Sequence, residues 1–127
     1  MTSYTSVFGN DTIPPSGNSY VAIALTADTT LSWPEQATGT TVTGAIMALT
    51  STGAWAVTMP AANQASVGRD LLISNNSAFT ITLKDSTGGT LGTISTGVSK
   101  YVYIADNSTA AGTWVVITFG TGVGAAD

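Results

Sequence analysis

The sequence contains no histidine and no cysteine among its 127 residues. The absence of cysteine excludes disulfide bonds, thiolate chemistry and cysteine-based metal sites. Histidine is the usual general base near neutral pH and the commonest metal ligand, so its absence removes the simplest routes to hydrolysis and to metal binding. We therefore expect a protein that is not an enzyme and that has no cofactor, no metal site and no small-molecule substrate.

Charged residues are also scarce, at 8% of the chain against roughly 25% in an ordinary globular domain. The net charge of −4 reflects a shortage of bases, since the only cations are Arg69, Lys84 and Lys100. A polyanion is bound by several clustered cations, and the apolar residues are too interspersed for a membrane span. We expect no nucleic-acid partner and no membrane partner. The opening MTSYTSVFGND lacks a basic segment followed by an apolar run, so we expect no Sec signal.

Short apolar runs recur along the chain, and hydrophobic residues make up 43% of it. The runs cover residues 20–27, 29–33, 44–50, 54–59, 69–74, 78–84, 90–95, 98–104 and 113–119. They are rich in β-branched and aromatic residues and are separated by Gly, Asn, Asp and Ser, a pattern typical of antiparallel sheets. The sequence predicts an all-β fold, either an antiparallel β-sandwich of jelly-roll-like form or a small barrel. One helical turn is expected within residues 61–66, and no repeat is regular enough to predict a solenoid.

The chain is long enough for one hydrophobic core and too short for two. We expect an extended N-terminal arm over residues 1–19, a β-sandwich domain over residues 20–120 and a flexible tail over residues 121–127. Pro14 and Pro15 forbid both regular helix and central strand in the arm. The arm nevertheless carries four large apolar residues that make a free tail unfavourable, so we expect them to bind a partner or a sister subunit. These candidate partner-binding residues are Tyr4, Val7, Phe8 and Ile13.

Seven carboxylates are the remaining candidates for catalysis. A glycosidase needs two of them facing each other across a cleft. Asp85 opens a turn before Gly88 and Gly89, however, and Asp106 begins the loop before Trp114. Aspartate is common in such positions because its side chain bonds to the turn backbone. We interpret both residues as turn formers.

The three tryptophans could either anchor the core or bind sugars on an aromatic face. Trp55 and Trp114 lie inside apolar runs, which favours the core. Trp33 stands beside Pro34 and Glu35 at the end of a run, so we expect it to be partly exposed. Trp33 therefore joins the arm residues as a candidate for partner binding.

The last two runs are apolar on both faces. In one, Tyr101 and Tyr103 alternate with Val102 and Ile104, and in the other apolar residues from position 114 to 119 fall on both sides. A strand that is half-buried against one core alternates apolar with polar residues instead. Both faces of these strands need cover, and neighbouring subunits of a symmetric oligomer can supply it. We expect a homo-oligomer.

A long stretch resembles structural proteins of tailed-bacteriophage virions. It reads VTMPAANQASVGRDLLISNNSAFTITLKDSTGGTLGTISTGVSKYVYIADNSTAAGTWVVITFG, residues 57–120. The resemblance lies in a strand ending in a Met-Pro step, an Asn-rich turn, a TITLKD strand, a Gly turn and a final W-V strand after a DNST loop. The segments SYTSVFGNDTIPPS and ALTADTTLSWP are similar to short virion proteins as well.

The resemblance implies a capsid decoration (cement) protein, located on the capsid surface of the virion and made in the host cytoplasm. Such a protein binds as a trimer across adjacent major capsid subunits and stabilises the shell. An alternative is a tail or head-fibre component, acting as an adaptor or host-binding module. The absence of coiled-coil heptads and long fibrous repeats favours decoration. A third class, a carbohydrate-binding module or lyase, depends only on an exposed Trp33 and on unpaired carboxylates.

Overall fold

The computed structural model describes residues 18–34 and 41–119, and these form an almost entirely β structure. The expected all-β fold is confirmed, and each expected apolar run contains a strand. The elements are β1 (Asn18–Leu25), β2 (Thr29–Thr30), β3 (Gly44–Ser51), β4 (Ala56–Thr58), the 3-10 helix η1 (Ala62–Gln64), β5 (Asp70–Asn75), β6 (Ile81–Lys84), β7 (Thr90–Ile94), β8 (Ser99–Asp106) and β9 (Thr113–Phe119). The helix η1 lies within the turn predicted over residues 61–66. The strand β1 begins inside the segment expected to form the arm.

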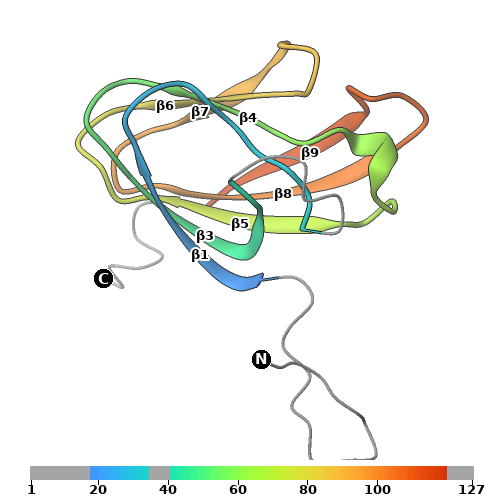
Figure 1. Cartoon of the computed structure of the whole chain (residues 1–127), viewed down its shortest axis with the longest axis horizontal. Helices are drawn as coiled ribbons and strands as arrows, with labels where there is room; N and C mark the ends of the chain where they lie inside the picture. The colour runs from blue at the N-terminus through green and yellow to red at the C-terminus, as the bar shows by residue number, and fades with distance from the viewer. Residues whose placement is uncertain (1–17, 35–40, 120–127) are drawn as a thin grey trace, which may run out of the picture.

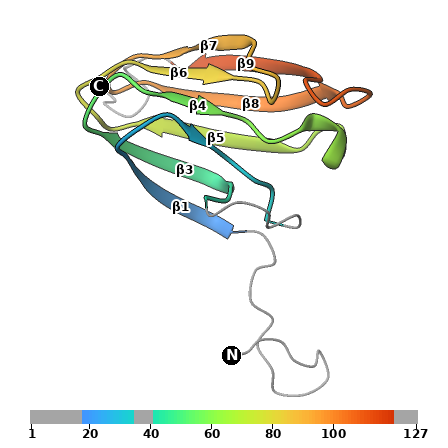
Figure 2. The same ribbon diagram turned by 45° about the horizontal axis from the view of Figure 1, so that its top comes forward.

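The strands form two sheets that face each other as two layers (Figures 1 and 2). The first, here called sheet A, has the order β1-β3-β5-β8-β9, and the second, sheet B, has the order β2-β4-β6-β7. Sheet B covers one face of sheet A. The opposite face of sheet A, here called its outer face, is covered by no other described element.

Both sheets are mixed rather than antiparallel. From β1 to β6 the chain crosses to the other sheet after every strand, so strands that are neighbours in a sheet run parallel. Only the β6–β7 and β8–β9 connections are hairpins. The antiparallel arrangement expected from the sequence is therefore wrong for the first six strands. The prediction failed because a connection rich in Gly, Ser and Asn can either return the chain within the same sheet or carry it across to the facing sheet, and the local sequence does not distinguish the two.

The winding has a regular period, which the sequence analysis missed. Tyr20 pairs with Ile46, and Ile46 pairs with Leu72, so each turn of the chain around the core takes 26 residues. The same spacing joins Val57 to Leu83 in sheet B. The β2–β4 pair departs from it, since Thr29 lies opposite Val57. The first six strands therefore form three turns of a flattened solenoid, and the two hairpins complete the sheets.

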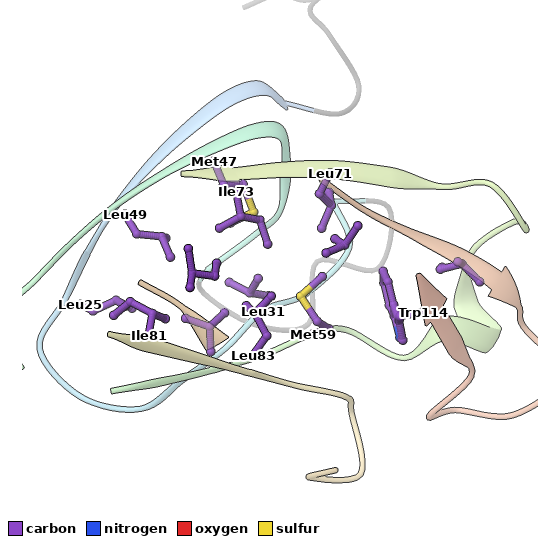
Figure 3. Packing of buried hydrophobic residues seen from close by; sticks show 14 of the residues in the cluster. Leu25, Leu31, Met47, Leu49, Met59, Leu71, Ile73, Ile81, Leu83 and Trp114 are labelled. Carbon is purple, nitrogen blue, oxygen red and sulfur yellow. The ribbon is translucent and has the colours of Figure 1, made fainter. Parts of the chain in front are cut away.

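The core fills the space between the two sheets (Figure 3). Met47, Leu71 and Ile73 point inward from sheet A and meet Ile81 and Leu83 of sheet B, all almost completely inaccessible to solvent. Alternate residues of each strand thus face this core, as the two-residue period of a strand requires. The intervening residues of sheet A point to its outer face.

One polar side chain occupies a core position. Asn75, at the end of β5, is 0% exposed and lies in register with Leu49 of β3. Its Nδ2 donates to the carbonyl oxygens of Phe79 and Ile94, at 2.7 and 2.8 Å. Its Oδ1 accepts from the backbone N–H and the hydroxyl of Ser77. The amide thereby ties the β5–β6 turn to the end of β7 and leaves none of these polar groups unpaired.

We predict that Asn75→Asp lowers the free energy of unfolding by on the order of 3 kcal/mol. The carboxylate cannot donate to the Phe79 and Ile94 carbonyl oxygens, and it places a charge in the core. Asn76→Asp is the matched control because Asn76 is exposed, and it should change stability by less than about 0.5 kcal/mol. Urea unfolding of both variants measures the difference, and equal losses would contradict this role of Asn75.

Candidate interaction surface

Four of the five residues predicted to bind a partner, Tyr4, Val7, Phe8 and Ile13, lie outside the described residues. The fifth, Trp33, is 0% exposed, so its predicted partial exposure is wrong. Its indole N–H donates to the Ala61 carbonyl oxygen at 2.8 Å. Trp33 is a core residue and is not available to a partner or a sugar.

Trp33 belongs to a cluster that closes one end of the core. Its ring stacks on Trp114, with centroids 6.1 Å apart, and the Arg69 guanidinium lies 4.5 Å from its centroid. Gly112 lies in the loop between β8 and β9, close to η1. A Cβ at this position would lie 2.3 Å from the Ala62 Cβ, so only glycine allows the loop to approach η1 this closely. Trp114 of β9 thus covers the ring of Trp33, which was expected to be partly exposed. The core placement of Trp114 is confirmed, whereas Trp55 packs against the core and is half-buried.

The described carboxylates are engaged in turns or on the sheet surface. Asp85 Oδ1 accepts hydrogen bonds from the Thr87 hydroxyl and from the backbone N–H groups of Thr87 and Gly89. Asp106 Oδ1 accepts from the backbone N–H of Ser108. Both predicted turn formers are confirmed. Among the described residues no three acidic side chains gather closely enough to hold a metal ion.

The outer face of sheet A carries the most conspicuous surface feature. One row of large apolar or aromatic side chains, here called the large-residue row, crosses all five strands. Successive members pair in the strand register, and they are Tyr20, Ile46, Leu72, Tyr101 and Ile117. Three of them are well exposed, Tyr20 at 61%, Ile46 at 44% and Ile117 at 43%. Neighbouring strands lie about 4.8 Å apart, so the row is continuous.

A second row lies beside the first, two residues further along β1, β3 and β5. This small-residue row consists of Ala22, Ala48, Ser74 and Ser99, and ends at Phe119 in β9. The hydroxyls of Ser74 and Ser99 hydrogen-bond to each other at 2.7 Å, so they satisfy part of their own bonding capacity. The two rows run side by side about 6.8 Å apart. Over β1, β3, β5 and β8 the side chains thus change from large to small between the two rows, whereas on β9 both rows carry large ones, Ile117 and Phe119.

A charged residue, Asp70 of β5, lies on the outer face beside the large-residue row, in register with Tyr103 of β8. The Tyr101 hydroxyl donates to Asp70 Oδ2. The Tyr101 and Tyr103 rings also contact each other, with centroids 6.0 Å apart. The carboxylate is therefore partnered within the face and sits at the margin of the large-residue row.

Sheet B presents the opposite character on its solvent side. There Thr58 pairs with Lys84, and Ala56 pairs with Thr82, which in turn pairs with Thr93. Such polar and small residues are typical of a sheet face exposed to water. The asymmetry between the sheets shows that the apolar residues of sheet A are not a general property of this surface.

The sequence pattern predicted part of the outer face. It identified the strands of Tyr101 and Ile117 as apolar on both sides, and the structure confirms this. It missed Tyr20, Ile46 and Leu72, whose signal is the 26-residue spacing of large apolar residues. That spacing becomes meaningful only once the parallel pairing is known.

Comparisons with protein-family models, with curated proteins and with solved structures find no match. In the described part of the chain, no helix is long and apolar enough to cross a membrane. The candidate site therefore has to be interpreted from its own chemistry.

We predict that stability stays nearly constant between about pH 5.5 and 8, where an unperturbed histidine would titrate. The Thr87 hydroxyl bond lowers the pKa of Asp85, and the Ser108 backbone bond lowers the pKa of Asp106. Their stabilising contributions are complete above the unfolded pKa and are lost as the pH falls through the folded pKa. The hydrogen bond to Asp70 raises the pKa of Tyr101, so its contribution is complete below the unfolded pKa, about 10, and is lost at higher pH.

Melting temperatures across the pH range measure this plateau. We expect a decline below about pH 4 and another above about pH 10. A change of many degrees between pH 5.5 and 8 would contradict the prediction. A sharp rise in melting temperature on adding zinc or calcium would contradict the separate expectation that the protein has no metal site.

Proposed function

We propose that this protein is a non-enzymatic structural component of a tailed-phage virion, a capsid decoration protein. In this proposal it acts as a homotrimer that binds across adjacent major capsid subunits and stabilises the shell. The observation that carries the proposal is the large-residue row on the outer face of sheet A, which is an apolar surface suited to protein contact. The resemblance of residues 57–120 to virion proteins supports the assignment to this class.

The chemistry of the outer face favours a protein partner over a sugar. Ile46, Leu72 and Ile117 alternate with the aromatic residues, and aliphatic side chains offer neither a stacking ring nor a hydrogen bond. A carbohydrate site needs polar groups placed around an aromatic platform. The burial of Trp33 also removes the residue on which the carbohydrate-binding alternative depended.

The proposed benefit to the particle is mechanical. A protein that contacts two capsid subunits at once adds its binding free energy to the contact between them. Bivalent attachment of an oligomer multiplies this effect, because the second contact forms at high effective concentration. The shell then resists the outward pressure of packaged DNA better than the undecorated shell does.

We predict that the isolated full chain is a trimer at micromolar concentration. The reason is the apolar outer face together with the low charge of the chain. Light scattering coupled to size exclusion measures the mass, with a monomer of 12.8 kDa as the reference. A monomer at this concentration would contradict the oligomeric part of the proposal.

The particle itself provides the test of the virion assignment. Quantitative mass spectrometry of purified particles should find hundreds of copies of the chain on the capsid surface. A handful of copies would favour the alternative tail or head-fibre component. The absence of the chain from particles would overturn the virion assignment.

The arm is expected to contribute to attachment. We predict that deleting residues 1–17 leaves the β structure folded but weakens oligomerisation or capsid binding. Ordering an extended arm costs about 1–2 kcal/mol per residue in backbone entropy, so the bound surface must supply apolar contacts and backbone hydrogen bonds in return. Binding of full-length and truncated chains to undecorated particles measures the effect. If truncation changed neither capsid binding nor the mass of the oligomer, the arm would have no role in attachment.

A further inference from the structure

We propose that copies of this chain meet through the outer face of sheet A, with the large-residue row of one copy packed against the small-residue row of another. The inference rests on the proposed function in taking the protein to be a homo-oligomer, and it assigns the surface that joins the subunits. The occupant of the face is thus a second copy of the chain.

Shape is the first argument. On four of the five strands the large-residue row stands beside an alanine or a serine of the small-residue row, so each copy offers a row of projecting side chains and a row of mostly short ones. When Ile46 of one copy lies over Ala48 of another, neighbouring pairs along the rows also place large side chains over small ones, because Tyr20 is aligned with Ile46 and Ala22 with Ala48. Interdigitation of this kind produces the dense packing of protein interiors.

Charge is the second argument. The chain has a net charge of −4, so two copies repel each other through most surfaces. Among the described carboxylates, Asp28 bonds to the backbone N–H of Ala56 in a loop, and Asp85 and Asp106 belong to turns. Asp70 is at the margin of the face and is partnered by Tyr101. Contact through the outer face therefore brings only the Asp70 carboxylate of each copy to the margin of the interface, while the other described carboxylates stay in loops and turns.

Area is the third argument. Five strands about 4.8 Å apart and about six residues long, at about 3.3 Å per residue, give a face of about 480 Å². In a ring of three copies each face is divided between two neighbours, so the three faces together bury about 1,440 Å², or about 480 Å² for each contact. A single contact of this size is small for a lasting assembly, so the association depends on closure of the ring, which matching copies provide and a short peptide does not.

The rows also suit a closed ring. If the rows run along a threefold axis, each copy gives its large-residue row to one neighbour and receives the row of the other neighbour on its small-residue row. Such a head-to-tail contact closes on itself after three copies and leaves no apolar row uncovered. Sheet B then faces outward with its threonine-rich surface.

Charge substitutions test the surface. We expect Ile46→Lys to weaken self-association by at least about 30-fold, as the loss of a central interface residue does. Ala48→Phe should have a similar effect, because it places a large side chain in the small-residue row, where the large-residue row of the other copy has to pack. Phe79→Lys is the matched control, since Phe79 is an exposed apolar residue in the β5–β6 turn, at 39% exposure, and belongs to neither row. Light scattering measures the mass, and near-ultraviolet circular dichroism checks that each variant is folded.

Cross-linking provides a second measurement that does not depend on a disruptive change. The chain has no cysteine, so any disulfide must come from an introduced thiol. Ile46→Cys and Ala48→Cys proteins, when mixed and oxidised, should form the mixed disulfide in preference to either self-pair. Phe79→Cys protein, mixed in place of either one, should not. This result follows from the packing of one row against the other.

The outcomes separate this inference from the proposed function. If the outer-face variants keep the mass of the wild type and the mixed disulfide does not form, the inference is overturned, while capsid binding by the wild type still supports the proposed function. If the variants become monomers and the Phe79→Lys control does not, the inference is supported. A wild-type chain that is itself monomeric would overturn both the inference and the oligomeric part of the proposal.

Discussion

The crossing of the chain from one sheet to the other after each of its first five strands is the constraint on which the structure depends. Because consecutive strands face each other across the core, the inward residues of each turn are covered by the other strand of the same turn. The outward residues of sheet A have no such cover, since the connections from β1 to β6 all lead to the side of sheet B. Large side chains at outward positions such as Tyr20 and Ile46 are consequently left exposed in the single chain.

The two ends of the core are closed by different means. At the end of β5, the fully bonded Asn75 holds the turn and β7 through four hydrogen bonds. At the other end, Trp33 stacks on Trp114 and the Arg69 guanidinium lies over the Trp33 ring. One closure is polar and directional and the other is largely aromatic. Together they fix how far the two sheets extend, and the outer face of sheet A gains a rigid support.

The sequence predicted the strands well and their pairing poorly. Alternation of β-branched residues and the Gly-, Asn- and Asp-containing breaks depend on local chemistry, which is why runs such as 44–50 and 69–74 contain β3 and β5. Whether a break returns the chain or sends it across the core depends on distant contacts, and the parallel pairing of β3 with β5 was therefore missed. Trp33 was misjudged for the same reason, because the Trp114 ring that stacks on it comes about 80 residues later, in β9. The part of the candidate surface in β8 and β9 was predicted from the sequence. The part in β1, β3 and β5 could be identified only once the pairing register of the strands was known.

The 26-residue turn has an evolutionary consequence. Each turn adds one strand to sheet A, and with it one side chain to each of the two rows, as the steps from Tyr20 to Ile46 to Leu72 show. Duplication or loss of a whole turn preserves which residues point inward and changes only the length of the rows. In the proposed role, the strength of the contact could therefore be adjusted in discrete increments by the number of turns, without redesign of the core or of either closure.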